Sequence, residues 1–552
     1  MPLKSTIHSF FSLFGLLFLF SCASKQEFTK RDVKKSERLI GIHFAKQGRD
    51  TLYPYLKRNR EGFDSLRKYP LDNDVFPAIR FDPVPFGFEM PQQTENQAWE
   101  IPDNVEIPEP YDALAFYTIP QLASLIKHQK ITSTALTQFF LDRLKKYQPE
   151  LQCTISITDS LALAQAKRAD DEIQNGTYRG ILHGIPYGTK DLMAVPGYPT
   201  TWGAAPYQNQ MLNETATVVK KLKEAGAVLV AKLVSGALAR GDVWFGGKTK
   251  NPWDLKQGAS GSSAGSGSAT AAGLVPFALG TETLGSITSP STRNGITGLR
   301  PTYGRVSRHG VMSLSWSMDK VGPMGRNAED CAIVFSVIQG KDKKDLTTVD
   351  LPFGVNWDKD ISELRVAYLK KDIEKDTTES GDNLRTAIKT LEGMGIQPTP
   401  VEMPDGIPYR GFDIILRAEA GAFFDRLVRS GEVDLMVEQD QRSRANSLRQ
   451  SRFIPAVEYL QANRHRQVLI EKMQNLMEDY DVLISPSFGN DQLLATNLTG
   501  HPVIAIPTGL NKKNHPTSMT FVGNLYDEAS ILLLAKAFQE KTTFDELHPP
   551  GF

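Results

Sequence analysis

Residues 257–281 read QGASGSSAGSGSATAAGLVPFALGT, and this run of 25 residues is uncharged in a chain of which 23% is Asp, Glu, Lys or Arg. Composition alone fits a flexible Gly/Ser linker equally well, because such segments behave as random coil. The second half favours burial, since its alanines and the apolar residues Leu274, Val275, Phe277 and Leu279 are typical of a buried helix and strand. The small residues then mark places where backbones approach closely. We therefore expect this run to form the centre of a core.

The composition excludes several classes of protein. With 552 residues, 40% of them hydrophobic, the chain is long enough for a sizeable core. The 63 basic residues equal the 63 acidic ones, so no concentrated basic surface is indicated and we expect no nucleic-acid partner. The three cysteines Cys22, Cys153 and Cys331 are too few for a disulfide scaffold or a Cys-based zinc site, and no HExxH motif occurs. We expect no metal, and we expect Cys153 and Cys331 to be buried free thiols.

Residues 1–21 are predicted to be a signal peptide. Lys4 supplies the positive start, and the apolar stretch 10–20 is too short to span a bilayer comfortably. The ending LFSC at 19–22 resembles a bacterial lipobox, which predicts a lipid on Cys22 and an exported protein anchored to the bacterial cell envelope without a transmembrane helix. Phe20 is bulkier than the residue usual at its position. Simple cleavage with a secreted product is the alternative.

Residues 22–111 are interpreted as a tether followed by a proline-rich, extended arm, and 112–552 as the main domain. A short helix is compatible with 30–44, but seven prolines between 77 and 110 interrupt every later periodic run. The arm carries four large aromatic residues, Phe81, Phe86, Phe88 and Trp99. Because such side chains are costly to leave in water, we expect the arm to lie on the main domain.

Regular structure is predicted from Thr118 onward. Helices are expected to begin at Thr118, at Thr132 or Ser133, and at Asp159. After Gly176, apolar runs typical of strands buried on both faces occur at 227–231, 364–368, 481–485 and 503–506. They alternate with helical patterns at 217–225, 327–338, 457–478 and 527–541, and Asn327 is the expected cap of the second of these helices. This alternation indicates an α/β fold.

One short motif matches a catalytic pattern but lacks the preceding strand that the pattern requires. GSSAG at 261–265 fits the GxSxG nucleophile elbow, which would make Ser263 a nucleophile. An elbow follows a strand, whereas residues 251–257 do not favour a strand. We therefore reject this interpretation.

Three longer blocks resemble the core of the amidase signature family. They are GIPYGTKDL at 184–192, SGSSAGS at 260–266 and GTETLGSI at 280–287. Supporting blocks are NPW at 251–253, GLRPTYGRVS at 298–307, DKVGPM at 319–324, NLTGHP at 497–502 and DEA at 527–529. The resemblance covers roughly residues 112–542. It implies a single large α/β domain with a mixed, twisted sheet surrounded by helices.

The same resemblance implies a Ser-Ser-Lys catalytic triad and an acyl-enzyme. Ser286 would be the nucleophile, Lys190 the base and Ser262 the bridging serine, with no metal or organic cofactor. The backbone N–H groups of an oxyanion hole would come from Thr283, Leu284, Gly285 and Ser286. Substrate contacts are expected at Trp244, Phe245 and Ser263, although core packing explains Trp244 and Phe245 equally well.

The chemistry supports a lysine in this role. A lysine at its reference pKa of about 10.4 is protonated and cannot act as a base near neutral pH. Burial disfavours the ammonium form and can lower the pKa by several units. The uncharged run 257–281 would provide such an environment, so Lys190 could draw the proton of Ser286 through Ser262.

Two departures from the common family pattern, Asp-Thr-Gly-Gly-Ser-Ile-Arg, concern specificity. Leu284 stands where glycine is usual, and Thr288 replaces a charged residue. Neither removes a catalytic hydroxyl or the lysine. Asp191, beside the lysine, is interpreted as a structural hydrogen-bond acceptor.

The sequence therefore predicts an exported amidase that cleaves an amide C–N bond of a small-molecule or peptide-like substrate. One alternative is the glutaminase (A) subunit of a tRNA-dependent amidotransferase, which export would disfavour. The other is a catalytically silent binding lipoprotein on the same scaffold. The predicted partners are the amide substrate and, through the lipid alone, a membrane; the sequence does not indicate the oligomeric state or the substrate.

Overall fold

The computed structural model of the protein describes residues 27–91, 97–488 and 491–552. The predicted signal peptide and Cys22 lie outside these residues. The chain divides into two compact units, Met1–Pro70 and Leu71–Phe552.

The first unit consists of two helices, α1 (Lys30–Ile40) and α2 (Lys46–Leu66). Thr29 and Asp32 form a capping box at the start of α1, which ends at Gly41 with φ of 73°. The carboxylate of Glu37 is buried and lies 3.0 Å from the guanidinium of Arg49 on α2. The helix compatible with 30–44 is thus present in shorter form, whereas α2, which contains Pro54, was not predicted.

The second unit is built on a mixed sheet of eleven strands in the order β1-β3-β2-β8-β10-β9-β14-β15-β13-β11-β12. Their bounds are β1 Thr154–Ile157, β2 Pro186–Lys190, β3 Val228–Leu233, β8 Ala278–Glu282, β9 Thr297–Arg300, β10 Lys320–Gly325, β11 Val366–Leu369, β12 Thr399–Val401, β13 Val482–Pro486, β14 Val503–Leu510 and β15 Pro516–Gly523. Strand β2 is parallel to β3 and to β8, and β11 is parallel to β12 and β13. The other neighbouring pairs are antiparallel. The predicted α/β class with a mixed sheet is confirmed.

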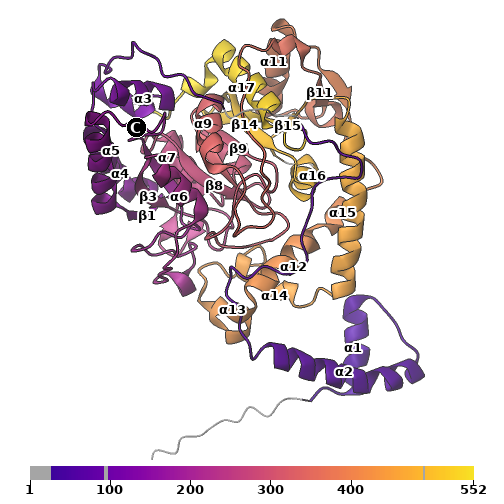
Figure 1. Ribbon diagram of the computed structural model, residues 1–552. Coiled ribbons are helices and arrows are strands. Elements are labelled where there is room, and N and C mark those ends of the chain that lie inside the picture. The colour runs from indigo at the N-terminus through magenta and orange to yellow at the C-terminus, as the bar shows by residue number, and fades with distance from the viewer. Residues whose placement is uncertain (1–26, 92–96, 489–490) are drawn as a thin grey trace, which may run out of the picture. The chain divides into compact units, whose positions relative to one another are not determined.

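Helices surround this sheet (Figure 1). The longer ones are α3 Ile119–Lys127, α4 Ser133–Leu151, α5 Asp159–Gln174, α9 Ala328–Ile338, α11 Glu379–Gly393, α12 Asp413–Phe423, α15 Ala456–Met477, α16 Asp491–Thr499 and α17 Glu528–Thr542. Helices α4 and α5 pack at the β1–β3 end of the sheet, and α11 lies toward the β11 end (Figure 1). The predicted N-caps Thr118, Thr132 and Asn327 each accept a hydrogen bond from a backbone N–H of the first turn.

The uncharged run forms the buried centre that we expected. It contains helix α7 (Ala264–Ala271), buried along its whole length, and most of strand β8. At Gly265 an added Cβ would lie 2.3 Å from both the backbone N of Val234 and the carbonyl O of Cys153. The glycine is therefore required by close backbone approach, and the linker interpretation is wrong.

The described residues 71–91 and 97–110 belong to the second unit and lie on it as an extended arm. The side-chain amide of Asn73 donates to the carbonyl O of Ser313, and the N–H of Ser313 donates back to Asn73. The Trp99 indole N–H donates to Ser336 Oγ. Phe81, Phe88 and Trp99 are partly covered, but Phe86 is 88% exposed, contrary to the expectation.

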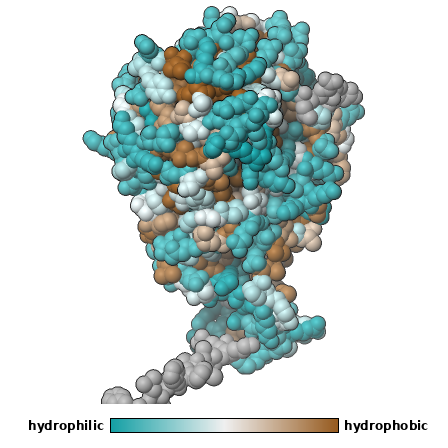
Figure 2. All heavy atoms as spheres, turned by 60° about the vertical axis from the view of Figure 1, so that its left-hand side comes forward, coloured by the Kyte–Doolittle hydropathy of each residue, from teal (hydrophilic) through white to brown (hydrophobic). Residues whose placement is uncertain are grey.

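The surface and the cysteines give little further information. The face shown in Figure 2 is mainly hydrophilic, with apolar residues in small groups. Of the helices in the described ranges, none combines the length and apolar character needed to cross a bilayer. Cys153 and Cys331 are buried free thiols, as predicted.

Candidate active site

The candidate site lies where the parallel strands β2 and β8 end. Lys190 is the last residue of β2 and Glu282 the last residue of β8, and Thr189 pairs with Leu279. The carboxyl ends of adjacent parallel strands meet at one edge of a sheet, where α/β proteins commonly bind ligands. Residues far apart in the sequence are thereby brought together.

Lys190 is fully buried among hydroxyl groups. Its Nζ lies 2.8 Å from Ser262 Oγ, 3.0 Å from Ser263 Oγ and 2.8 Å from Thr281 Oγ1. No carboxylate within the described ranges lies within 4.0 Å of Nζ. A neutral amine has two N–H donors and one lone pair, so three hydroxyl neighbours can satisfy it without a counter-ion.

The surroundings favour this neutral form. Burial lowers the pKa of Lys190 well below its ordinary value, and the more distant carboxylates of Asp319 and Glu282 oppose this only in part. The absence of an ion-pair partner within the described ranges is the structural reason that desolvation prevails.

Ser286 is held beside this cluster through the backbone. The N–H of Ser263 donates to the carbonyl O of Ser286 over 3.2 Å, and Ser286 is 8% exposed. The hydrogen bonds of the described residues do not include one between the hydroxyls of Ser286 and Ser262. Lys190 and Ser262 are thus in direct contact, and Ser286 adjoins them with a hydroxyl that forms no hydrogen bond to another described residue.

The turn before Ser286 presents free backbone N–H groups. In the described part of the chain, the N–H groups of 283–286 form no hydrogen bond, whereas those of Ile287 and Thr288 donate to Glu282. Gly285 has φ of 83°, and a Cβ there would lie 3.0 Å from Ser289 Oγ. Unpaired N–H groups next to a serine suit an incoming carbonyl oxygen.

Leu284 replaces the usual glycine without backbone strain. It is not among the described residues with positive φ, and its side chain is half-buried. In this turn only position 285 requires a glycine conformation. The substitution therefore alters the side chain next to the site, not the course of the backbone.

Glu282 anchors the end of β8. One carboxylate oxygen accepts from the N–H groups of Ile287 and Thr288 and from the Thr288 hydroxyl, and the other lies 2.7 Å from the Arg300 guanidinium. Asn497 donates to it as well. Burial alone would raise the pKa of Glu282, but Arg300 and these hydrogen bonds hold it at about 2. Thr288 thus takes part in fixing the turn.

Asp191 has the structural role that we expected. Its carboxylate lies 2.7 Å from Lys232 Nζ and accepts hydrogen bonds from the N–H and the hydroxyl of Thr201. All of these groups are buried. Both oxygens of the Asp191 carboxylate are engaged in these contacts.

A small cavity adjoins the site. Its volume is about 10 Å³, room for about one water, and its walls include Thr281, Thr283 and Asp319. Thr283 Oγ1 donates to Asp319 over 2.6 Å. We call this the inner cavity.

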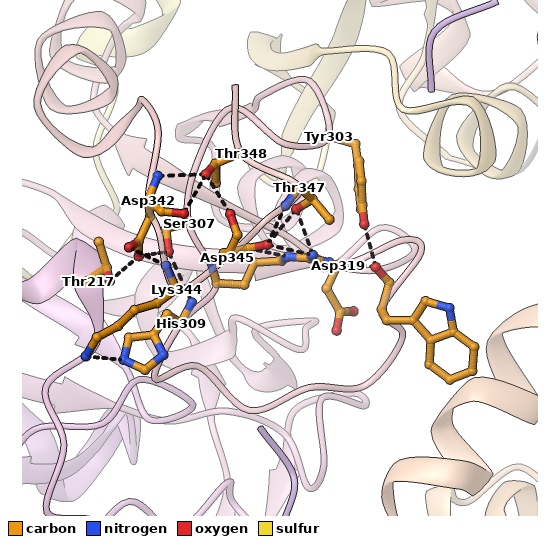
Figure 3. A network of polar contacts seen from close by, with 12 residues as sticks. Thr217, Tyr303, Ser307, His309, Asp319, Asp342, Lys344, Asp345, Thr347 and Thr348 are labelled. Carbon is orange, nitrogen blue, oxygen red and sulfur yellow. Dashed lines mark hydrogen bonds and ion pairs between the residues drawn. The ribbon is translucent and has the colours of Figure 1, made fainter. Parts of the chain in front are cut away.

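The segment 303–319 forms much of the wall of the inner cavity and is held by a polar network (Figure 3). The Arg308 guanidinium lies 3.0 Å from the carboxylate of Asp345 and also donates to the carbonyl O of Trp316. Asp342 accepts from the hydroxyls of Ser307 and Thr217. Burial raises the pKa of Asp345, but Arg308 outweighs burial and holds it at about 2. The wall is therefore fixed by charge-assisted hydrogen bonds.

The structure does not bring the three residues expected to contact substrate together at the inner cavity. Ser263 is fully buried against Lys190. The rings of Trp244 and Phe245 pack 4.9 Å apart, and neither lines the inner cavity. Thr281, which the sequence did not single out, is a direct partner of Lys190. Its place in the GTETLGSI block gave no signal without knowledge of the β2–β8 pairing.

No metal site is evident within the described ranges, where no three His, Cys, Asp or Glu side chains group suitably for an ion. The groups that the site presents are hydroxyls, a buried amine and backbone N–H groups. Such a set suits covalent catalysis by a serine.

Comparison with known proteins agrees with this class of site. The family model described as Amidase matches residues 135–495. The A subunit of glutamyl-tRNA(Gln) amidotransferase from Coxiella burnetii is 32% identical over 479 residues, covering 78% of this chain and 99% of the relative. Its counterpart from Acinetobacter baylyi is 33% identical over 476 residues, covering 77% and 96%. The chain belongs to the amidase signature family.

A solved structure gives the same result for the fold. Peptide amidase from Stenotrophomonas maltophilia superposes with a TM-score of 0.70 at 26% identity, covering 81% of this chain and 100% of the other. The names of both sequence relatives contain the term glutamyl-tRNA(Gln). These names do not fit the expectation, made from the composition, that the protein has no nucleic-acid partner.

Proposed function

We propose that the protein hydrolyses an amide C–N bond of a small-molecule or peptide-like substrate, using Ser286 as nucleophile, Ser262 as bridge and Lys190 as base. The observation that carries the proposal is the fully buried Lys190 amine, 2.8 Å from Ser262 Oγ and without a counter-ion within the described ranges. A neutral amine in that position is a competent base.

The proposed reaction conserves protons. Ser286 Oγ attacks the carbonyl carbon while its proton passes to Ser262 and the proton of Ser262 passes to Lys190. The N–H groups of 283–286 stabilise the oxyanion. Collapse breaks the C–N bond as the same relay, reversed, protonates the leaving nitrogen. Water then attacks the ester on Ser286 while its proton passes through Ser262 to Lys190. The ester C–O bond breaks, the acid is released, and the proton returns through the same relay to Ser286 Oγ.

A fluorophosphonate probe tests the nucleophile. We expect the wild-type protein to be labelled and Ser286→Ala to be unlabelled, with Ser289→Ala as a matched control that retains labelling. Equal labelling of wild type and Ser286→Ala would contradict enzymatic function and favour a silent binding protein.

The glutaminase is a second candidate, and it is favoured by relatives whose names describe an amidotransferase and that are matched over 96–99% of their length. The same triad would then release ammonia from glutamine. The relevant experiment measures hydrolysis of glutamine and of a panel of other amides by the purified chain alone. Turnover of several amides supports the free-standing amidase, whereas turnover of glutamine only, or only with added partner proteins and tRNA, supports the glutaminase.

We propose in addition that the protein is exported and lipidated at Cys22, on the strength of residues 1–22 of the sequence. Export would separate it from aminoacylated tRNA. Palmitate should be incorporated into the wild type but not into Cys22→Ala. Failure to label the wild type would remove the anchor and would restore the glutaminase as a candidate.

A further inference from the structure

A larger cavity shares part of its wall with the inner cavity. Its volume is about 470 Å³, and Val311 and Met312 line both cavities. We call it the outer cavity. It is the size of a small-molecule site. It adjoins the inner cavity through these shared residues, so under the proposed function it is the place where substrate groups beyond the scissile amide would lie.

The arm forms one side of the outer cavity. Residues 71–74 line it, and Phe76 lines the inner cavity. The paired hydrogen bonds between Asn73 and Ser313, of 3.1 and 2.7 Å, fix this part of the arm to the wall segment. Residues 71–76 precede the region 135–495 that the family model matches. The arm therefore supplies this side of the cavity from outside the region that the family model matches.

The lining of the outer cavity has an excess of negative charge. Four carboxylates, those of Asp72, Asp74, Glu214 and Glu432, face one guanidinium, that of Arg426. Glu214 lies 3.6 Å from His309 Nε2, which in turn contacts Lys344. Within the described ranges Asp72 and Asp74 form no ion pair. The arm thus contributes unpaired negative charge.

Aromatic rings form another part of the lining. The rings of Trp202 and Tyr207 lie 4.6 Å apart, and Phe424 packs 6.1 Å from Trp202. Glu432 and Arg426 are close enough to Tyr207 to influence its pKa, which burial raises to about 12. Carboxylates beside aromatic faces are the usual surroundings of a bound organic cation.

We propose that the outer cavity selects amide substrates that carry a positively charged group, and that Asp72 and Asp74 of the arm are specificity-determining residues. This inference rests on the proposed hydrolase function, because it concerns which amides that hydrolase selects. It concerns binding alone, however, and can be tested without turnover. Long-range attraction and contact with the rings would both favour an ammonium group over a methyl group at the same place.

The test uses the inactive Ser286→Ala variant and two amides that differ by one terminal ammonium group. Nα-acetyl-lysinamide carries an ammonium group that Nα-acetyl-norleucinamide lacks. Calorimetric titration should give about tenfold tighter binding of the lysine amide. Adding Asp72→Asn and Asp74→Asn should reduce this preference to about threefold or less, and high salt should also weaken it.

A control pair removes the same charge elsewhere. Asp358→Asn with Asp405→Asn changes two exposed carboxylates that line neither cavity, and the preference should stay at its starting value. Equal affinity for the two amides, undetectable binding of both, or a preference unaffected by Asp72→Asn and Asp74→Asn would overturn the proposal. Loss of turnover in the wild type is a separate result that bears on the hydrolase function.

Discussion

At the scale of single residues, the position of Lys190 has a direct kinetic consequence. Burial lowers its pKa, so the base should be deprotonated far below the ordinary lysine range. The value of kcat/KM should therefore rise with pH to a plateau that is reached well below the ordinary lysine range.

Lys190→Ala should decrease kcat by about a thousandfold or more and remove this pH dependence, because the proton acceptor is lost. Circular dichroism would establish that the fold persists. A pH–rate profile similar to that of the wild type would exclude Lys190 as the base.

A second prediction about a single residue concerns Gly285. An alanine there would have to adopt φ of 83° and would meet Ser289 and Leu493 at 3.0 and 3.2 Å. We expect Gly285→Ala to cost about 1–3 kcal/mol of stability and to decrease kcat roughly ten- to a hundredfold, because the N–H groups of the turn are displaced.

Gly176→Ala is the matched control, since Gly176 has φ of 79° but nothing within 4 Å of an added Cβ. It should lose a similar amount of stability and no activity. If Gly285→Ala retained full kcat, the turn would have no role in oxyanion binding.

At the scale of elements, Glu282 joins β8, β9, α8 (Thr288–Asn294) and α16. Glu282→Gln leaves the buried Arg300 without its counter-ion and should lower the free energy of unfolding at pH 7 by about 3 kcal/mol. Urea titration measures the change. Glu329→Gln, which alters a partly exposed pair with Lys536, should change it by no more than about 1 kcal/mol.

The carboxylate of Glu282 should also make the free energy of unfolding depend on pH. Its folded pKa of about 2 lies below the ordinary 4.5, so its contribution is complete above pH 4.5 and is lost as pH falls toward 2. The difference in stability between wild type and Glu282→Gln should therefore narrow across that range. A constant difference would mean that the charge of Glu282 is unimportant.

Elements with local signals were predictable from the sequence. The caps Thr118 and Asn327 gave the starts of α3 and α9, and the apolar run at 227–231 gave β3. Strand β2 could not be predicted, because PYGTK has no strand pattern and owes its conformation to pairing with β3 and β8. For the same reason Thr281 was not recognised as a partner of Lys190.

At the scale of the whole molecule, the arm sets the boundary of the functional unit. A chain beginning at residue 71 keeps the Asn73 and Trp99 hydrogen bonds and the stacking of Arg466 on Phe81, 3.5 Å from the ring centroid. A chain beginning at residue 112, the boundary expected from the sequence, loses all three.

We expect the chain from 71 to match the wild type in melting temperature and kcat/KM. The chain from 112 should melt at least about 5 °C lower and lose about tenfold or more in kcat/KM. Thermal unfolding and steady-state assays measure both. Equal behaviour of the two truncations would show that the arm has no part in stability or the cavity walls.

The buried amines also affect the proton balance of folding. Burial lowers the pKa of Lys320 as well as that of Lys190 well below the ordinary value, so both amines lose their protons at a lower pH in the folded protein than in the unfolded chain. Unfolding then takes up protons at these two positions, and the free energy of unfolding should increase with pH. The formal net charge of zero counted from the composition assigns a full charge to every lysine. For Lys190 and Lys320 this count of charges describes the unfolded chain. Because the protons taken up on unfolding come from the buffer, the measured enthalpy of unfolding should vary with the ionisation heat of the buffer.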